Sequence, residues 1–358
     1  MKKIIISLLL ITVNHLCYAQ GCVAIRSING FGQYLHGTNA FSSDNWQINI
    51  NQRYFKAFRD FKGTTDQKTP SQNESVTKSY TMEILLTRIF NKGWSVALSL
   101  PYLVNSRETN GEHGGPNTTK HTTHSSGIGD IRITAYKWLI TPRVNQNFNI
   151  EAGLGIKLPT GDYKYQDNFY RNDTTYVSAP VNPAIQLGDG GSGIVAELNT
   201  FYFLTKSISL YGNFYYLSNP REQNGSSTLF GRTATSLQLK TYNTVASVTD
   251  QYAIRIGANA VAGDWVFSGG LREEGIPVKD LIGGSNGTRR AGYNISVEPG
   301  ITYRTKKVDI YAYVPVVIKR KIKQNIPDQL ATQITGTYTH SPGGSGNYLL
   351  FAGIAFRL

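Results

Sequence analysis

Strict alternation of apolar and polar residues is the feature of this sequence that most limits its fold. The segment FNIEAGLGIKLPTGDY spans residues 148–163, and its apolar side chains fall at every second position from Phe148 to Leu158. A period of two places these side chains on one face of a β-strand. The same pattern recurs in runs close to the length of a tilted membrane-crossing strand, at 80–86, 94–102, 308–318 and 348–358.

The rest of the composition agrees with a chain built from strands. After residue 19, no apolar run approaches the roughly 18 residues that a membrane helix needs. The 36 glycines and 22 tyrosines, together with many Thr, Ser and Asn residues, favour an all-β protein. We expect about twelve strands, at 46–61, 78–91, 93–105, 128–140, 147–162, 193–204, 207–218, 250–262, 264–276, 291–304, 307–321 and 347–358.

The connections between these strands distinguish a membrane barrel from a soluble sandwich. Five tight connections, at 91–93, 141–146, 205–207, 262–264 and 305–307, alternate with six long polar ones, at 62–77, 106–127, 163–192, 219–249, 277–290 and 322–346. Short turns on one side, long loops on the other and an even number of strands are typical of an outer-membrane barrel. The sequence therefore predicts a transmembrane antiparallel up-and-down β-barrel over residues 46–358.

A secreted β-sandwich is the alternative, with its apolar faces meeting in a core and its other faces broadly charged. The faces opposite the apolar ones are instead rich in Gly, Ser, Thr and Asn with isolated charges, as in a narrow lumen. Aromatic residues also gather at strand ends, as in the interface girdles of barrels, at Trp46, Trp94, Tyr102, Phe148, Trp265, Tyr348 and Phe356.

The N-terminal residues read as an export signal. Lys2 and Lys3 precede an apolar stretch, and Cys17-Tyr18-Ala19 resembles a cleavage site, so we expect residues 1–19 to be a signal peptide. A lipoprotein signal ending at Cys22 is the rival interpretation. Residues 20–45 contain no clean strand, and we expect a periplasmic segment that is either a plain tail or a plug inside the barrel.

The charge and cysteine content exclude some classes of protein. The net charge of +13 falls to +11 without Lys2 and Lys3, but the basic residues are scattered in an exported chain, so we expect no nucleic-acid partner. Only Cys22 remains after processing, so an internal disulfide is excluded.

If the apolar phase faces lipid, the alternate residues face the lumen. They carry both signs of charge, and such charges are stable inside a barrel only where they are hydrated or paired with each other. Two interpretations stay open: a mutually neutralised ladder that fills the lumen, or a polar permeation path. The inward tyrosines are likewise either packing or a lining for an apolar or aromatic solute. The candidate lumen-lining residues are Glu83, Asp130, Arg132, Glu151, Lys157, Glu197, Arg255, Arg272, Glu274, Glu298, Arg304, Tyr211, Tyr215, Tyr311 and Tyr313.

The loops offer no clear catalytic or metal motif. The spacing of His113, His121 and His124 fits no usual ligand pattern. GDGGSG at 188–193 has too few carboxylates for a calcium loop, and the adjacent pairs His124-Ser125 and His340-Ser341 lack a nucleophile elbow. We expect neither catalytic residues, nor a metal, nor another cofactor.

Several segments resemble a known family. GIGDIRITAYKWL (127–139) and GLGIKLPTGDY (153–163) are similar to segments of outer-membrane β-barrel transporter-like proteins grouped with the meta pathway of phenol degradation, of the kind found in Bacteroidetes-like bacteria. The similarity continues at 46–58, 98–106 and 269–303. It implies a barrel and uptake of small organic, including aromatic, compounds. The terminal Leu358 departs from the usual final Phe of barrel assembly signals, although Phe356 lies close.

These observations together predict a monomeric barrel in the cell outer membrane that passes a small solute passively, with lipid and the barrel-assembly machinery as partners. The alternative is a sealed structural or adhesion barrel that acts through its extracellular loops, and an outer-membrane hydrolase is a third possibility. Within the segment 272–290 we expect a folded-in extracellular loop in which Arg289 or Arg290 pairs with Glu273, Glu274 or Asp280.

Overall fold

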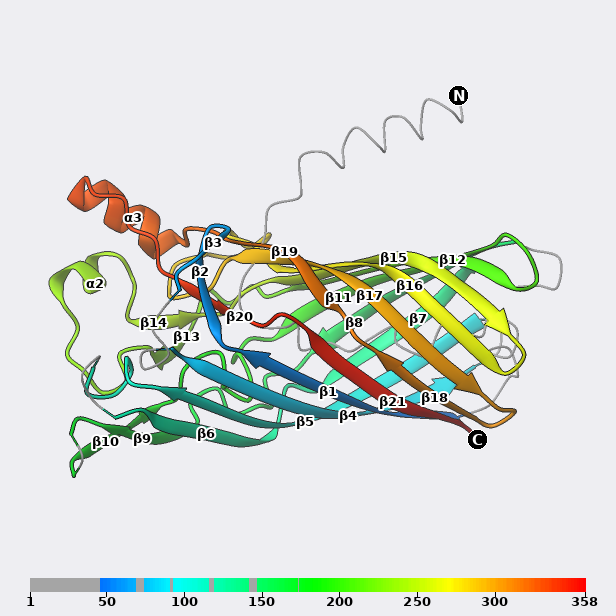
Figure 1. Ribbon diagram of the computed structural model, residues 1–358, viewed down its shortest axis with the longest axis horizontal. Helices are drawn as coiled ribbons and strands as arrows, with labels where there is room; N and C mark the ends of the chain where they lie inside the picture. Colours follow the sequence, from blue (N-terminus) through cyan, green and yellow to red (C-terminus); the bar gives the residue numbers. More distant parts are fainter. Residues whose placement is uncertain (1–45, 69–73, 91–92, 116–118, 142–146, 173) are drawn as a thin grey trace.

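The protein is a closed antiparallel β-barrel of twelve wall strands. The computed structural model describes residues 46–68, 74–90, 93–115, 119–141, 147–172 and 174–358. Short turns meet at one end of the barrel and long loops at the other (Figure 1). The expected signal peptide at 1–19 and the expected tail or plug at 20–45 lie outside the described residues.

The twelve wall strands follow one another around the barrel. Two of them are interrupted, at 129–131 between β6 and β7 and at 314–315 between β18 and β19. In chain order the wall consists of β1 (Trp46–Ala57), β4 (Val76–Ile89), β5 (Trp94–Thr109), β6 (His121–Ile128) with β7 (Arg132–Ile140), β8 (Phe148–Lys157), β11 (Gly193–Phe203), β12 (Ile208–Ser218), β15 (Gln251–Ala262), β16 (Trp265–Ile276), β17 (Gly292–Arg304), β18 (Val308–Tyr313) with β19 (Val316–Ile322), and β21 (Leu349–Arg357).

The barrel closes where the first and last wall strands pair. β1 and β21 are antiparallel neighbours from Gln47↔Arg357 to Phe55↔Leu349. On the far side, β16 pairs with β17 over their whole lengths, so the described wall has no unpaired edge. Closure satisfies the backbone hydrogen bonds of every strand, which is the condition for a sheet to cross a bilayer.

The long connections carry small elements of their own. The loop between β1 and β4 contains β2 (Arg59–Lys62) and β3 (Thr65–Asp66), and β2 pairs with β20 (Gly343–Ser345) from the last loop. The remaining loop elements are β9 (Gln166–Tyr170), β10 (Tyr176–Pro180), β13 (Gln223–Ser227), α2 (Ser236–Lys240), β14 (Val245–Ser247) and α3 (Ile326–Thr335). All of them lie at the left-hand end of Figure 1.

Local sequence explains where the two described helices begin and end. The Thr235 and Gln238 side chains form a reciprocal capping box at the start of α2. Asn325 caps α3 by accepting from the Asp328 N–H, and α3 ends at Gly336, whose φ of 69° is left-handed. Neither of these helices is long and apolar enough to cross a bilayer.

The outer surface of the wall is apolar in the phase that the alternation predicts. Leu154 is 66% exposed and Ile156 is 50% exposed, whereas their neighbours Gly155 and Lys157 are buried. Trp46, Trp94 and Phe148 are also exposed, at the end with the short turns. A closed sheet with such a belt is the surface of a protein that sits in lipid.

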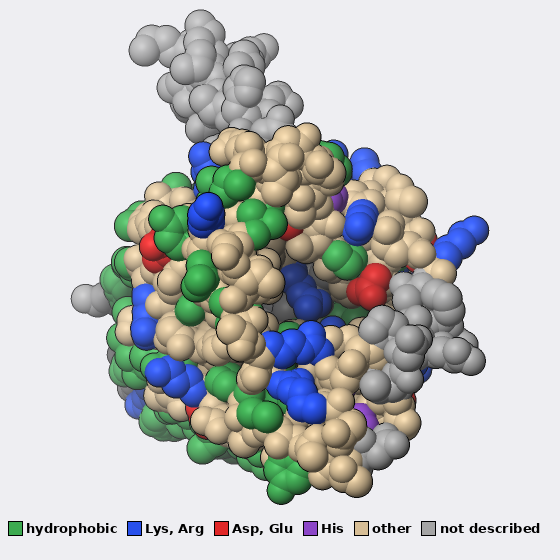
Figure 2. All heavy atoms as spheres, turned by 90° about the vertical axis from the view of Figure 1, so that its left-hand side faces the viewer, with side chains coloured by type: hydrophobic (Ala, Val, Ile, Leu, Met, Phe, Trp, Pro, Cys, Tyr) green, Lys and Arg blue, Asp and Glu red, His purple; other side chains and the backbone are tan. Residues whose placement is uncertain are grey.

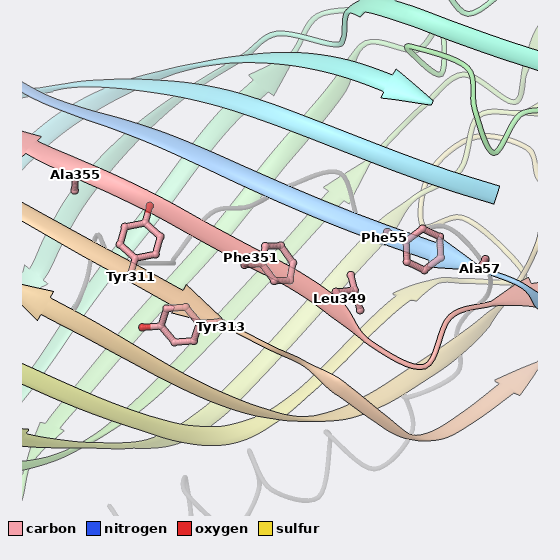
Figure 3. Close-up of a cluster of buried hydrophobic side chains, with 7 residues drawn as sticks. All are labelled: Phe55, Ala57, Tyr311, Tyr313, Leu349, Phe351 and Ala355. Carbon is pink, nitrogen blue, oxygen red and sulfur yellow. The ribbon is translucent and has the colours of Figure 1, made fainter. Parts of the chain in front are cut away.

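Aromatic side chains also point inward, against β1, β18 and β21. Phe55, Tyr311, Tyr313, Leu349 and Phe351 form a buried cluster (Figure 3). Small residues make room for the two tyrosines. Gly353 lies opposite Tyr311 and Gly300 opposite Tyr313, and a Cβ on Gly353 would lie only 2.5 Å from the Tyr311 ring.

The sequence-based strand limits were wrong at several places. The strand expected at 46–61 ends at Ala57, because β2 belongs to a separate sheet, and the one expected at 147–162 ends at Lys157. Residues 106–127 were expected to be a loop, but β5 runs to Thr109 and β6 begins at His121, so this hairpin is longer than expected. The strand expected from residue 128 is interrupted at 129–131, where the Asp130 side chain pairs with Lys157. The strand expected at 307–321 is interrupted next to Pro315, which has no N–H to donate to a ladder.

Candidate permeation path

A hydrogen-bonded network crosses the lumen on one side of the barrel. Glu83 on β4 is fully buried, and its Oε1 accepts from Arg132 Nη2 on β7 at 2.5 Å. The Ser99 hydroxyl donates to the same oxygen, and Asn51 Nδ2 donates to Oε2 at 3.3 Å. Tyr311 donates its hydroxyl to Asn51, which extends the network to β18.

A second network continues around the other side. Arg255 on β15 donates to Glu298 Oε1 on β17, from Nε at 2.7 Å and from Nη2 at 2.5 Å. Glu298 Oε2 lies 3.6 Å from Arg272 Nη1 on β16, and Arg272 Nη2 donates to Glu274 at 2.8 Å. From Arg255 the network runs through Asn213 to Asn199 and then to Glu151 on β8.

Aromatic rings cover the two arginines of this second network. The rings of Tyr211 and Tyr313 lie 5.6 and 5.7 Å from the Arg255 guanidinium, and Phe351 lies 5.3 Å from that of Arg272. These distances are typical of cation–π contacts. The aromatic side chains therefore help to hold the buried cations instead of standing free in an open lumen.

The candidate lumen-lining residues on the wall strands are almost all buried. Glu83, Arg132, Glu151, Lys157, Glu197, Arg255, Arg272, Glu274, Glu298 and the four tyrosines are each at most 9% exposed. Asp130 is half-buried in the interruption between β6 and β7, and Arg304 is half-buried next to the turn at 305–307. The pairing resembles the neutralised ladder more than a wide polar channel.

Three glycine-aspartate motifs meet above these networks. Lys157 Nζ lies 3.2 Å from Asp130 Oδ2 and also pairs with Asp189. Asp130 accepts from the backbone N–H groups of Gly161 and Asp189, at 3.0 and 3.2 Å. The motifs at 129–130, 159–162 and 188–190 therefore build one junction between the wall and the long loop after β8.

The glycines at this junction allow two backbones to touch. A Cβ on Gly161 would lie 2.6 Å from the Leu187 carbonyl oxygen and 2.7 Å from the Gly188 nitrogen. A Cβ on Gly188 would lie 2.6 Å from the Gly161 carbonyl oxygen. Only glycine fits at both positions, because the obstacles are backbone atoms.

Above the junction, the long loops line a chamber of about 300 Å³. Its wall is rich in side-chain amides and hydroxyls, with an apolar part that includes Pro183, Phe230 and Ile276. Its charged residues are Glu112, Asp189, Arg289 and Arg290. The face of the molecule that bears these loops is hollowed at its centre, with Lys and Arg side chains beside the hollow (Figure 2).

Most of the chamber's charges are already paired. Glu112 Oε1 accepts from Arg107 Nε at 2.7 Å and from Asn182 Nδ2 at 2.6 Å. Arg289 donates to both oxygens of Asp280, at 2.8 and 2.5 Å. The loop 277–291 is thus folded in and tied by an ion pair of the expected kind, whereas Glu274 pairs with Arg272 within the wall.

A smaller cavity of about 30 Å³ adjoins the chamber, because Asp189 and Gln251 line both. Its other lining residues include Arg132, Lys157 and Leu187. It therefore lies at the junction, between the loop chamber and the paired residues of the lumen. The candidate path narrows sharply there.

His113 is buried beside the chamber residue Glu112. Its Nδ1 accepts from the Tyr170 N–H at 3.0 Å, and its ring stacks on Phe169 at a centroid distance of 5.4 Å. Burial lowers the pKa of His113 from 6.5 to about 4, so the ring is neutral at pH 7. Among the described residues, no group of three His, Cys, Asp or Glu side chains is placed to hold a metal ion.

Sequence reasoning missed the chamber itself. Its amides and hydroxyls come from loops that pass one another only in the folded barrel. A single Asn or Gln in a polar loop belongs to no periodic pattern or motif that sequence analysis could detect. Arg289 and Arg290, at the start of a strand, did stand out in the sequence. They predicted an ion pair that ties down the loop 277–290, and not a chamber.

Comparison with known proteins places the barrel in a family. Residues 59–316 match the family described as "Putative MetA-pathway of phenol degradation", which is more than two thirds of the chain. The chain belongs to this family. The expected family is therefore confirmed, and so is the outer-membrane barrel.

Several solved structures match the chain at low sequence identity, and an outer membrane channel among them shares the fold. The COG4313 outer membrane channel from Pseudomonas putida F1 has a TM-score of 0.60 and 11% identity, covering 88% of this chain and 96% of that one. The translocator domain of the autotransporter NalP from Neisseria meningitidis has a TM-score of 0.46 and 9% identity, covering 90% and 91%. The toluene transporter TbuX from Ralstonia pickettii has a TM-score of 0.40 and 12% identity, covering 88% and 90%. No curated protein matches the sequence.

Proposed function

We propose that the protein is a passive channel for small organic solutes in the outer membrane. The observation that carries this proposal is the loop-lined chamber of about 300 Å³ that adjoins a second cavity inside the barrel. A chamber of this size can hold a solute of about one ring. The family membership supports the same function, and so does the channel named among the proteins of similar fold.

Single-channel recording in planar bilayers tests this proposal. We expect discrete current steps and, in parallel, swelling of proteoliposomes in small organic solutes. Ala184 lines the chamber and is half-buried, so Ala184→Trp should fill part of the space and lower the solute flux several-fold. Thr337→Trp, at an exposed loop position outside the chamber, should leave the flux unchanged.

The sealed adhesion barrel remains the second candidate, because one specific observation favours it. The paired charges of the lumen are at most 9% exposed, so the described side chains fill much of the interior. A folded wild-type protein that shows neither current steps nor swelling would contradict the channel and leave the sealed barrel.

A further inference from the structure

One charged side chain of the chamber, that of Arg290, pairs with none of the described residues. Glu112 is paired with Arg107, Asp189 with Lys157, and Arg289 with Asp280. Among the described residues, the Arg290 guanidinium takes part in no hydrogen bond, ion pair or ring contact. Arg290 is half-buried, so its charge is turned to the chamber without being fully screened by water.

The chamber also presents an aromatic side chain that is held in place. Phe230 lines the chamber, and its φ of 53° is left-handed, which is rare for a bulky residue. The Arg171 guanidinium donates to the Phe230 carbonyl oxygen, and the Phe230 ring stacks on Phe169 at 5.2 Å. The backbone strain at Phe230 is thus maintained by contacts with two residues that do not line the chamber.

The Arg290 guanidinium and the Phe230 ring can each bind a different part of one ligand. Guanidinium groups bind carboxylates through charge-assisted hydrogen bonds, and ring faces pack against apolar or aromatic rings. The volume of about 300 Å³ limits the ligand to about one ring with a short substituent. The surrounding amides and hydroxyls supply further donors to a carboxylate.

We propose that the chamber is a binding site for a small aromatic carboxylic acid, with the carboxylate on Arg290 and the ring against Phe230. This inference rests on the proposed channel function and narrows its solutes to organic anions. The rim of the hollow agrees with it, because the Lys and Arg side chains in Figure 2 would attract an anion to the mouth.

Titration calorimetry on the detergent-purified protein tests the site with benzoate and its neutral isostere benzamide. Benzoate should bind at least about tenfold more tightly than benzamide, the difference expected for one charge-assisted hydrogen-bonded contact. Raising the NaCl concentration should weaken benzoate binding and leave benzamide binding unchanged. Equal affinities of the two compounds would overturn the proposal without any variant.

Two variants separate the charge from the ring. Arg290→Gln should lower benzoate affinity about tenfold and leave benzamide affinity unchanged, whereas Phe230→Ala should weaken both. Lys279→Gln is the matched control, since it removes a positive charge from the same loop at an exposed position outside the chamber. An equal effect of Lys279→Gln and Arg290→Gln would overturn the site and indicate only a general surface charge.

Bilayer recordings distinguish failure of the site from failure of the channel. Current steps that benzoate does not block more than benzamide would leave the channel standing and overturn the acid-binding site. Tighter binding of a neutral sugar such as glucose than of benzoate would also overturn it. The absence of both steps and binding would overturn the channel and the site together.

Discussion

At the scale of single residues, the crossing of Gly161 and Gly188 leaves no room for a side chain. A side chain at Gly161 would collide with backbone atoms of Leu187 and Gly188, which cannot move without opening the junction. We expect Gly161→Ala to lower the free energy of unfolding by about 1–3 kcal/mol, as overpacking does elsewhere. Denaturant unfolding in detergent micelles, followed by tryptophan fluorescence, measures this change.

Gly269 on β16 provides the control for that experiment. A Cβ there would meet nothing within 4 Å, so Gly269→Ala should leave stability nearly unchanged. Equal losses for the two substitutions would mean that the crossing is not a special position.

His113 makes the loop beside the chamber sensitive to acid. Burial holds its pKa near 4, below the 6.5 of an exposed histidine, so protonation favours the opened loop. The stabilisation is complete above pH 6.5 and is lost as the pH falls toward 4, on the order of 1–3 kcal/mol in all. The protection factors of the amides at 109–115 and 119–121, which are corrected for the intrinsic exchange rate at each pH, should therefore fall over this range.

Two substitutions test whether His113 is the group responsible. His113→Asn keeps an acceptor for the Tyr170 N–H but does not titrate, so it should flatten the pH dependence. His124 is exposed, and His124→Asn should leave the pH dependence intact. A profile that His113→Asn does not alter would assign the effect to another group.

At the scale of elements, the wall strands are coupled by the buried network of Glu298. This carboxylate lies between the guanidinium groups of Arg255 and Arg272, from two other strands. Glu298→Leu would leave excess buried positive charge, and we expect a loss of about 3–5 kcal/mol in the free energy of unfolding.

Glu298→Gln is the milder comparison, because the amide keeps an acceptor oxygen at nearly the same place and size. It should cost clearly less than Glu298→Leu in the same denaturant titration. Identical losses would show that the acceptor oxygen contributes little, because both variants lack the charge of Glu298. The comparison therefore separates the hydrogen bonds to this oxygen from the loss of the charge.

At the scale of the whole molecule, the sorting of short turns and long loops predicts the orientation in the membrane, with the long loops outside the cell. In a Cys22→Ser background, cysteines at the exposed positions Lys240 and Thr337 should react with an impermeant thiol reagent on intact cells. A cysteine at Lys306, in the short turn between β17 and β18, should react only after the outer membrane is permeabilised.

The reverse labelling would contradict this orientation. Reaction at Lys306 alone on intact cells would place the long loops in the periplasm, and the chamber would then face the wrong side for uptake. Labelling of all three positions would indicate that the outer membrane is leaky. Assay of a periplasmic marker enzyme in the medium checks for such leakage.

The sequence by itself determined the barrel. A wall strand such as Phe148–Lys157 touches lipid on one face and lumen on the other, so its residues must alternate with a period of two, and this period is local. Connection lengths are local too, which is why the sequence predicted the strand number and the two kinds of loop. The interruption at 129–131 escaped prediction, and so did the ion pair that Asp130 makes there, because its partner Lys157 lies elsewhere in the chain.

The tertiary structure alone decided which residues meet. Glu83 and Arg132 are 49 positions apart, and only the register of β4, β5 and β7 brings them to 2.5 Å. The chamber depends even more on the fold, since Phe230 and Arg290 come from different loops and share no pattern. The physical reason is that alternation specifies the face on which a side chain lies, whereas closure and register specify what that face meets across the lumen.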